Sequence, residues 1–338
     1  MRVQNVRGIR PVVATVVIAL VAIGWAQPNA RGYVDMVYVP QVGKVLLFGG
    51  QAIPVPPYTM VGETWWWDPS DGTWTQVSSE PQPSPRGAGN LEVHDPTGTV
   101  VMFGGGVPRD GGFSSYSETW LFDPLEERWS LLEPVDGVSP EASIGEMLAY
   151  HPPSDLFVLH GGLTLSPFAF LDHTWHLDLA AARWTRVEPS TRPSGRNYNA
   201  FAYDPRSERL VMSGGGPEID DELWHYDPRN QTWSFVERPP LMPAMPYPRM
   251  VFDDATHTLL RYGGLGEHAD TVWAIDATGA TWTAVDIDGE TPGGISRFAM
   301  TAVPENGVLL FGGLYEGGDA FHGDLWLFDA AAGRWERR

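Results

Sequence analysis

The chain has 338 residues, enough to bury a large core, and carries 42 acidic against 22 basic residues, for a formal net charge of −20. This charge disfavours nucleic acid and anionic membrane surfaces as partners, because both would be repelled. Cysteine is absent, so disulfides, thiolate metal sites and cysteine nucleophiles are excluded.

Residues 1–26 have the layout of a secretory signal peptide. Three arginines precede an apolar run over residues 11–23, and the small residues Gly24 and Ala26 stand at the −3 and −1 positions of a cleavage site. An uncleaved anchor is the alternative, but the run is short for a helix that spans a bilayer. We therefore expect residues 1–26 to be removed, the mature chain to be periplasmic or extracellular, and no stable membrane insertion to remain.

From residue 31 onward one pattern recurs six times. An apolar segment ends in two glycines, a first Trp follows, an Asp stands three residues after that Trp, and a second Trp stands nine residues after the first. Six copies in register are not chance. The diglycines lie at 49–50, 104–105, 161–162, 214–215, 263–264 and 312–313; the first Trp lies at 65, 120, 175, 224, 273 and 326, and the second at 74, 129, 184, 233, 282 and 335.

Repeats of about 50 residues with a diglycine and two spaced aromatic residues are the signature of kelch propellers. Through the diglycine, the Glu/Asp-x-Trp-x-x-Asp segment and the second Trp, the chain resembles the kelch-repeat family over nearly its whole mature length. The resemblance implies an all-β fold, a six-bladed β-propeller of four-stranded antiparallel blades. The expected domain covers 27–338, with repeats at about 31–79, 80–135, 136–190, 191–239, 240–288 and 289–338.

Each repeat is expected to form strands A to D, from the axis outward. The Asp after strand C is predicted to accept backbone N–H groups in the C–D turn. The diglycine is predicted to end strand B, where φ is positive or a side chain would clash. Because the chain starts on a strand A and ends on a strand D, no blade is shared between the termini. Blade 6 is then expected to close on blade 1 by side-chain packing alone.

Loop lengths differ on one side of the predicted propeller. The segment from the second glycine to the first Trp is longest in repeats 1 and 2 and shortest in repeats 4 and 5, so the variation lies in the B–C loops. Alternating strand directions place B–C and D–A loops on the same face. Because ligands of a rigid scaffold usually meet its variable loops, we expect binding on this face, chiefly over blades 1, 2, 3 and 6. The segments cover 50–65, 105–120, 162–175, 215–224, 264–273 and 313–326.

Arginines recur shortly before the diglycine in every repeat but the third, where the D–A loop meets strand A. In kelch proteins such positions line the axial mouth, so a partial ring of Arg could bind a carboxylate or an acidic peptide. The alternative is that each Arg pairs with an acid or with carbonyls of a neighbouring blade. Blade 3 has Ser143 instead, and the chain has Gly89 and Asn199 where the family commonly has His. The residues concerned are Arg31, Arg86, Arg196, Arg249 and Arg297.

Aromatic residues are also frequent in the B–C loops. On polar loops they suit stacking on sugar rings or contacts with peptides, or they fold over their own blade. We take Arg86, Arg196, Arg249 and Arg297, with Phe113, Tyr116 and Tyr315, as the candidate ligand-binding residues. The other loop residues of this kind are Tyr58, Phe168, Phe170, Phe321 and His322.

No catalytic residue, metal site or cofactor is predicted. His173 and His176 are three apart on a strand and so point to opposite faces. Galactose-oxidase-like copper enzymes need a Tyr crosslinked to Cys, which this chain lacks. Periplasmic sialic-acid mutarotases are six-bladed kelch proteins of this size, but none of their acid and Arg residues maps onto a motif here.

Two hypotheses remain from the sequence. The first is an exported, non-catalytic kelch module that binds a protein or a glycan on the B–C/D–A face. The second is a small-sugar mutarotase or epimerase with a site at the axial mouth. An enzyme should show a deep polar pocket with a desolvated acid beside an Arg, whereas a binding module should show a broad face.

Overall fold

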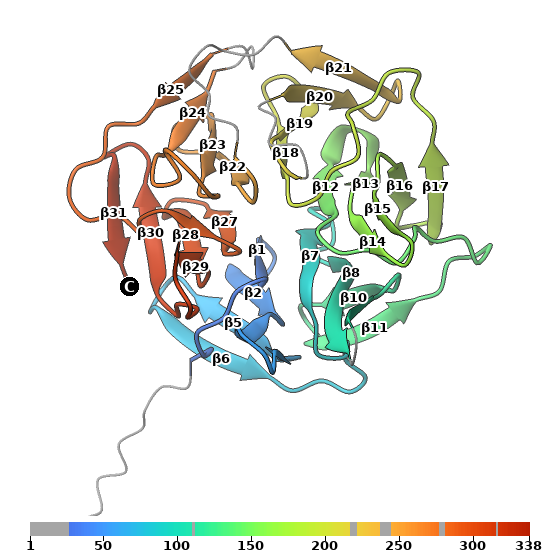
Figure 1. Ribbon diagram of the computed structural model, residues 1–338, viewed down its shortest axis with the longest axis horizontal. Coiled ribbons are helices and arrows are strands. Elements are labelled where there is room, and N and C mark those ends of the chain that lie inside the picture. Colours follow the sequence, from blue (N-terminus) through green and yellow to red (C-terminus); the bar gives the residue numbers. More distant parts are fainter. Residues whose placement is uncertain (1–26, 110–111, 217–221, 237–244, 277–280, 316) are drawn as a thin grey trace, which may run out of the picture.

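The computed structural model describes residues 27–109, 112–216, 222–236, 245–276, 281–315 and 317–338. The expected signal peptide lies outside these residues. Six sheets surround a central axis in the order of the sequence (Figure 1). This confirms the predicted all-β, six-bladed propeller with four-stranded antiparallel blades. Within the described residues, no helix could span a membrane.

The first three blades are built from consecutive strands, named in order from the axis outward. Blade 1 has β1 (Asp35–Val39), β2 (Lys44–Phe48), β5 (Thr64–Asp68) and β6 (Thr73–Val77). Blade 2 has β7 (Gly87–Val93), β8 (Val100–Arg109), β10 (Thr119–Asp123) and β11 (Arg128–Leu132). Blade 3 has β12 (Met147–His151), β13 (Leu156–His160), β16 (Thr174–Asp178) and β17 (Arg183–Val187), with a 3-10 turn η1 (Pro152–Ser154) between β12 and β13.

The last three blades repeat this order. Blade 4 has β18 (Ala200–Asp204), β19 (Arg209–Ser213), β20 (Leu223–Asp227) and β21 (Thr232–Val236). Blade 5 has β22 (Arg249–Asp253), β23 (Thr258–Tyr262), β24 (Trp273–Ile275) and β25 (Trp282–Ala284). Blade 6 has β27 (Ala299–Val303), β28 (Gly307–Phe311), β30 (Leu325–Asp329) and β31 (Arg334–Arg337), so no blade is shared between the termini.

Short accessory strands stand on the B–C/D–A face. The prediction that the diglycine ends strand B is wrong for blade 2. There β8 continues to Arg109 and pairs with β9. The long B–C loops of blades 1 and 3 also form hairpins, and one strand pair joins the D–A loop of blade 6 to its B–C loop. These strands are β3 (Gln51–Ile53) with β4 (Thr59–Met60), β9 (Gly112–Ser115), β14 (Leu163–Leu165) with β15 (Phe168–Phe170), and β26 (Ile295–Ser296) with β29 (Leu314–Tyr315).

The core consists of apolar side chains packed between neighbouring blades. One cluster joins Leu46 and Phe48 of blade 1 to Met102 and Trp129 of blade 2. The ring of Phe48 meets that of Trp129 edge-on, with centroids 5.3 Å apart. The second Trp of a repeat thus fills the wedge between its own sheet and the preceding one, as its large flat side chain allows.

Three of these Trp side chains also form a hydrogen bond to the preceding blade. The indole Nε1 of Trp129 donates to Thr64 Oγ1 at 2.9 Å, and that of Trp184 donates to Thr119 Oγ1 at 3.0 Å. Trp233 makes the same bond to Thr174 at 3.0 Å. In each case the Thr immediately precedes the first Trp of its repeat, so the bond links blades 1–2, 2–3 and 3–4.

The closure of the ring differs from the expectation. Apolar residues of blades 1 and 6 do share one cluster, but backbone hydrogen bonds also join the two ends of the chain. Arg31 N donates to His322 O at 3.2 Å, and Arg31 O accepts from Gly313 N at 2.9 Å. The reason is that the segment before β1 follows the same path as a D–A loop. In the D–A loop of blade 2, Arg86 O makes the equivalent bond and accepts from Gly50 N at 2.9 Å.

The repeat's turn residues take the predicted roles. Asp68 Oδ1 accepts from Ser70 N at 2.9 Å, and Asp123 Oδ1 accepts from Leu125 N at 2.9 Å, so the Asp side chain closes the C–D turn. At Gly49 φ is +69°, and an added Cβ would lie 2.6 Å from the backbone oxygen of Arg86. Only glycine therefore allows the D–A loop to cross the end of strand B so closely.

Candidate functional site

Three cavities follow one another along the propeller axis, and we call this series the channel. The axial mouth, on the B–C/D–A face, has a volume of about 460 Å³ and is lined by residues such as Tyr33, Tyr247 and Arg297. The lower chamber, at the A–B face, has a volume of about 410 Å³ and is lined by the inner strands of all six blades. A neck of about 20 Å³ lies between them and shares residues with both.

A ring of six residues with left-handed backbone surrounds the top of the channel. We call it the axial ring; one member comes from each blade, just before strand A or, in blade 2, at the second residue of β7. Backbone N–H groups link four consecutive pairs: Tyr33 to Arg297 O (2.8 Å), Ala88 to Tyr33 O (2.8 Å), Gly145 to Ala88 O (3.5 Å) and Tyr198 to Gly145 O (2.7 Å). The members and their φ angles are Tyr33 (52°), Ala88 (58°), Gly145 (68°), Tyr198 (50°), Tyr247 (64°) and Arg297 (60°).

Arg297 is the cation of this ring. Its Nε donates to Tyr33 Oη at 2.6 Å and its Nη1 donates to Ser296 Oγ at 3.1 Å. The guanidinium carbon lies 4.8 Å from the centroid of the Tyr247 ring and 5.3 Å from that of Tyr33. No described carboxylate lies within ion-pair distance of it, so its charge is held by neutral groups and remains available to an anion.

Three hairpins form an aromatic and apolar wall beside the mouth. Tyr58, Phe113 and Leu165 stand on the B–C loops of blades 1, 2 and 3 and all line the cavity. The rings of Tyr58 and Phe113 lie 5.8 Å apart, and both are exposed. The loops that vary in length in the sequence therefore do form part of the candidate site, together with the axial ring.

The outer arginines do not face the channel. Arg86 is 1% exposed, and its Nη2 lies 2.7 Å from Glu118 Oε2 while Nη1 donates to Gly104 O at 3.2 Å. The indole of Trp120 donates to the same Glu118 oxygen at 3.0 Å. Burial alone would raise the pKa of Glu118, but the hydrogen bonds from Trp120 and Arg86 hold it below its usual value.

The same Arg–Glu–Trp contact recurs in blades 1 and 4, and we call it the bracket. Arg31 meets Glu63 at 2.7 Å and Gly49 O at 3.1 Å. Arg196 meets Glu222 at 3.0 Å and Gly214 O at 3.3 Å. The expectation that these three arginines form a positive ring at the axial mouth is therefore wrong. They hold the D–A loop to their own blade and not to a neighbouring one. The reason is that they lie two residues before the axial ring.

Arg249 lies at a third level, on the first residue of β22. It lines the neck and the lower chamber. Its Nη2 is 3.8 Å from Asp35 Oδ1, and its Nε donates to Phe298 O at 3.3 Å. Burial raises the pKa of Asp35, while Arg249 and two backbone N–H groups oppose that rise. A desolvated acid beside an Arg thus exists, but it lines the lower chamber, below the axial ring, and not the axial mouth.

The other predicted aromatic residues have separate positions. Tyr116 packs against the guanidinium of Arg86, with 3.8 Å between the guanidinium carbon and the ring centroid. Tyr315 contacts His322, with ring centroids 3.9 Å apart, and lines a different cavity near Asp270. Of the seven candidate ligand-binding residues, the structure brings only Arg297 and Phe113 together at the mouth.

Blade 3, which lacks the bracket arginine, has a buried acid instead. Glu146 is 0% exposed and accepts a hydrogen bond from Ser143 Oγ at 3.0 Å. An added Cβ on Gly104 would lie 1.8 Å from Glu146 Oε1, so this carboxylate packs directly on the diglycine of blade 2. Burial raises the pKa of Glu146 to about 7, although Ser143 and backbone N–H groups oppose that rise.

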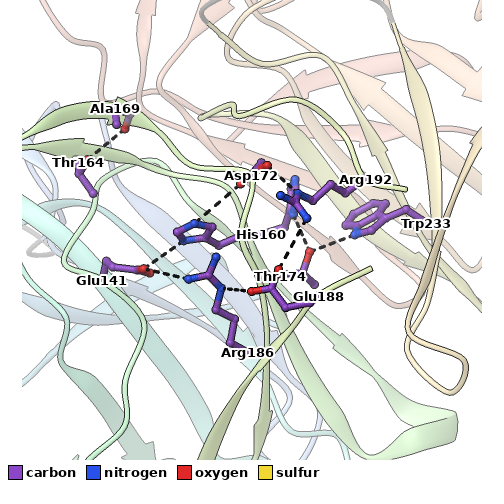
Figure 2. Close-up of polar contacts among 11 residues, drawn as sticks. Glu141, His160, Thr164, Ala169, Asp172, Thr174, Arg186, Glu188, Arg192 and Trp233 are labelled. Carbon is purple, nitrogen blue, oxygen red and sulfur yellow. Dashed lines mark hydrogen bonds and ion pairs between the residues drawn. The ribbon is translucent and has the colours of Figure 1, made fainter. Parts of the chain in front are cut away.

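The histidines near β16 take part in hydrogen bonds and ion pairs. His173 Nδ1 lies 3.1 Å from Glu141 Oε1, whereas His176 Nε2 lies 2.8 Å from Tyr226 Oη. Figure 2 shows the charged side chains of this part of blade 3, in which Glu141 faces Arg186 and Asp172 faces Arg192. These alternating charges join the loops of blade 3, and exposed pairs of this kind add little stability each.

The axial ring is the feature that sequence reasoning missed. Its members differ in chemistry, so no motif marks them. They do share a register, however: all but Arg297 stand at one fixed spacing before the first glycine of their repeat, as Tyr33 does before Gly49, and Arg297 stands one position closer. A search at one fixed register, instead of a broad window before the diglycine, could have separated Arg297 from the bracket arginines.

Comparison with known families agrees with this architecture. A family model described as the KLHDC2/KLHL20/DRC7 Kelch-repeats domain matches residues 35–249. This span covers well over half of the chain, from β1 to the first residue of β22. Blades 5 and 6 continue the same strand order beyond it.

Proposed function

Because the chain belongs to the kelch-repeat family matched by this model, whose domains generally mediate protein interactions, we propose that it is a binding module that holds an anionic group of a partner protein in the axial mouth. The observation that carries the proposal is Arg297. It is half-buried, faces the mouth and forms no ion pair with any described residue. A guanidinium in such a site favours a carboxylate, which it can hold through two parallel hydrogen bonds.

The lining of the mouth supports a protein ligand. Beside Arg297 it offers tyrosine rings, the apolar side chains Met60, Leu163 and Leu165, and the amide of Asn197. Aromatic and Arg side chains in a recess surrounded by apolar groups are typical of the residues that dominate protein–protein binding. An acidic segment with a neighbouring apolar side chain would use both parts of this surface.

Catalysis is the weaker alternative for this mouth. A mutarotase of the kind considered from the sequence needs an acid near the Arg, to move a proton. The described residues that line the axial mouth include no Asp or Glu. The aromatic pair of Tyr58 and Phe113 also suits a sugar ring, so a glycan is the ligand that the test must separate from a peptide.

The test is a thermal-shift screen of residues 27–338 against acidic peptides with apolar neighbours, acidic sugars, and neutral glycans. A peptide ligand at about 100 times its dissociation constant should add about 2.7 kcal/mol of stability. Arg297→Gln should weaken such a peptide by about 2 kcal/mol, because a desolvated charge pair is lost. Arg334→Gln, which removes the same charge from the exposed start of β31, should leave affinity unchanged. Binding of acidic sugars or neutral glycans alone, or equal effects of the two variants, would overturn the proposal.

We further propose that the protein is exported, as its N-terminal segment indicates. N-terminal sequencing of protein recovered outside the cytoplasm should then begin near Gln27. An intact N-terminus on protein extracted from membranes would contradict this.

A further inference from the structure

The lower chamber is a second recess, independent of the proposed function of the axial mouth. It opens between the A–B turns, on the face away from the long loops, and its lining includes all six inner strands. The bracket arginines do not line it, and Arg249 is its one described cation. Four carboxylates line the same space, those of Asp35, Glu92, Asp95 and Asp254.

Only one of these carboxylates, that of Asp35, lies within ion-pair distance of a described cation. Asp35 accepts from the backbone N–H groups of Met36 and Leu91, each at 3.0 Å, and lies 3.8 Å from Arg249. Glu92, Asp95 and Asp254 form no ion pair with any residue that the structure describes. Burial, and then repulsion from Asp95, raises the pKa of Glu92 well above its usual value, so a cation that enters the chamber would favour the ionised form of this carboxyl group.

Aromatic rings surround the same space. The fourth residue of the inner strand is aromatic in blades 1, 3, 4 and 5, and all four side chains line the chamber: Tyr38, Tyr150, Tyr203 and Phe252. Aromatic faces attract organic cations. One of these rings already does so, since the guanidinium carbon of Arg206 lies 5.5 Å from the Phe252 centroid.

A separate observation at the inner end of the chamber also indicates a ligand. Asn199 is 0% exposed, and neither its Oδ1 nor its Nδ2 has a hydrogen-bond partner among the described residues. Asn199 is one of the residues that line the neck, and the neck shares Met147 and Arg249 with the lower chamber. Leaving a buried amide unpaired costs free energy that a ligand donor or acceptor would recover.

We propose that the lower chamber binds a linear organic amine of more than one positive charge, with its cationic end among Glu92, Asp95 and Asp254 and its inner end hydrogen-bonded to Asn199. Unpaired carboxylates attract the ammonium groups, the aromatic rings accept the alkyl chain and the cationic edges, and Asn199 Oδ1 accepts an N–H. The described residues include no group of three or more Asp, Glu or His side chains placed to hold a metal ion, so an organic cation fits this arrangement better than a divalent metal.

The experiment is titration calorimetry of residues 27–338 with spermidine at constant ionic strength, with calcium chloride and magnesium chloride as separate titrants. We expect saturable one-to-one binding of spermidine, with weaker or no binding of the metal ions. Glu92→Gln should lower spermidine affinity at least tenfold, and Asp254→Asn should lower it several-fold. Asn199→Ala should also weaken it several-fold, by removing the acceptor at the inner end.

The controls separate this site from general charge effects and from the mouth. Glu133→Gln removes the same charge from an exposed position outside the chamber, and Arg297→Gln alters only the axial mouth; neither should change spermidine affinity. Glu92→Gln should not lower the melting temperature without ligand, because it removes a carboxylate that burial, and then repulsion from Asp95, disfavours. Equal binding of calcium or magnesium, equal effects of Glu92→Gln and Glu133→Gln, or full affinity in Asn199→Ala would overturn the proposal.

Discussion

Arginine has opposite roles in two adjacent regions of this propeller. In the brackets, Arg31, Arg86 and Arg196 are almost fully buried and bonded to an acid and to a glycine carbonyl of their own blade. In the axial ring, Arg297 is half-buried and held by tyrosine and serine. The two regions are only two residues apart in the repeat. The bracket, which recurs, therefore builds the blade, whereas the axial ring, whose members vary, gives the channel its chemistry.

The strongest test of this contrast is to remove a bracket arginine. Arg86→Ala should destabilise the fold by about 3 kcal/mol, because it leaves the Gly104 carbonyl and the buried side of Glu118 without their partner. Urea unfolding would measure the loss, with an unchanged slope m. Binding at the axial mouth, measured on the folded fraction, should be unaffected. If Arg86→Ala were instead stable but bound ligand more weakly, Arg86 would be a ligand-binding residue after all.

The next test concerns blade 3, which has no bracket and buries the acid Glu146. Its pKa is raised to about 7 in the fold, above the ordinary value of 4.5. Because the folded state then holds the proton more tightly than the unfolded one, this group's contribution is complete below about pH 4.5 and is lost as the pH rises to about 7. Glu146→Gln keeps the shape of the protonated acid and should remove the dependence.

The measurement is the difference in unfolding free energy between the wild type and Glu146→Gln from pH 4.5 to 8. The unfolding free energy of the variant, relative to that of the wild type, should rise by up to roughly 3 kcal/mol over this range, since each unit of pKa shift corresponds to about 1.4 kcal/mol. A difference that is flat with pH would show that the carboxylate is not destabilised by its position on the diglycine of blade 2.

Much of the fold could be predicted because each repeated residue has the same structural role in every blade. Gly49 and its equivalents must allow a close backbone crossing, Asp68 and its equivalents close a turn, and Trp129 and its equivalents fill a wedge. These needs depend on short-range geometry, so they appear in the sequence as fixed spacings.

The site could be predicted only in part. Phe113, chosen because it stands on a long B–C loop, lies in the lining of the mouth, but a two-residue shift in register decides whether an Arg is buried in a bracket or faces the channel. Sequence spacing does not show the left-handed bend at Tyr33 or Arg297 that creates this division. The sequence also did not indicate that Asn199 and Glu146 occupy the same position of the repeat, because no residue type recurs at that position before strand A.

A milder test compares blade interfaces that have the Trp–Thr hydrogen bond with those that lack it. Thr119→Val keeps the shape of the side chain but leaves the buried indole N–H of Trp184 without an acceptor. We expect a loss of about 2 kcal/mol, within the range for an unsatisfied buried donor. Thermal unfolding and urea unfolding should agree on it. No change in stability would mean that packing alone holds blades 2 and 3 together.

The smallest expected effect is the reverse change in blade 5. Val272 precedes the first Trp of its repeat, as Thr119 does, and is 2% exposed. The indole Nε1 of Trp335, in the next blade, is buried and has no hydrogen-bond partner among the described residues. Val272→Thr places a hydroxyl at the position that serves Trp184 in blade 3, so it should stabilise the fold by about 1 kcal/mol. Val272→Ala is the matched control, because it removes volume without adding an acceptor and should destabilise. If Val272→Thr lost as much stability as Val272→Ala, the packing of Val272 would outweigh the missing hydrogen bond, and the interfaces of blades 2–3 and 5–6 would be stabilised by different means.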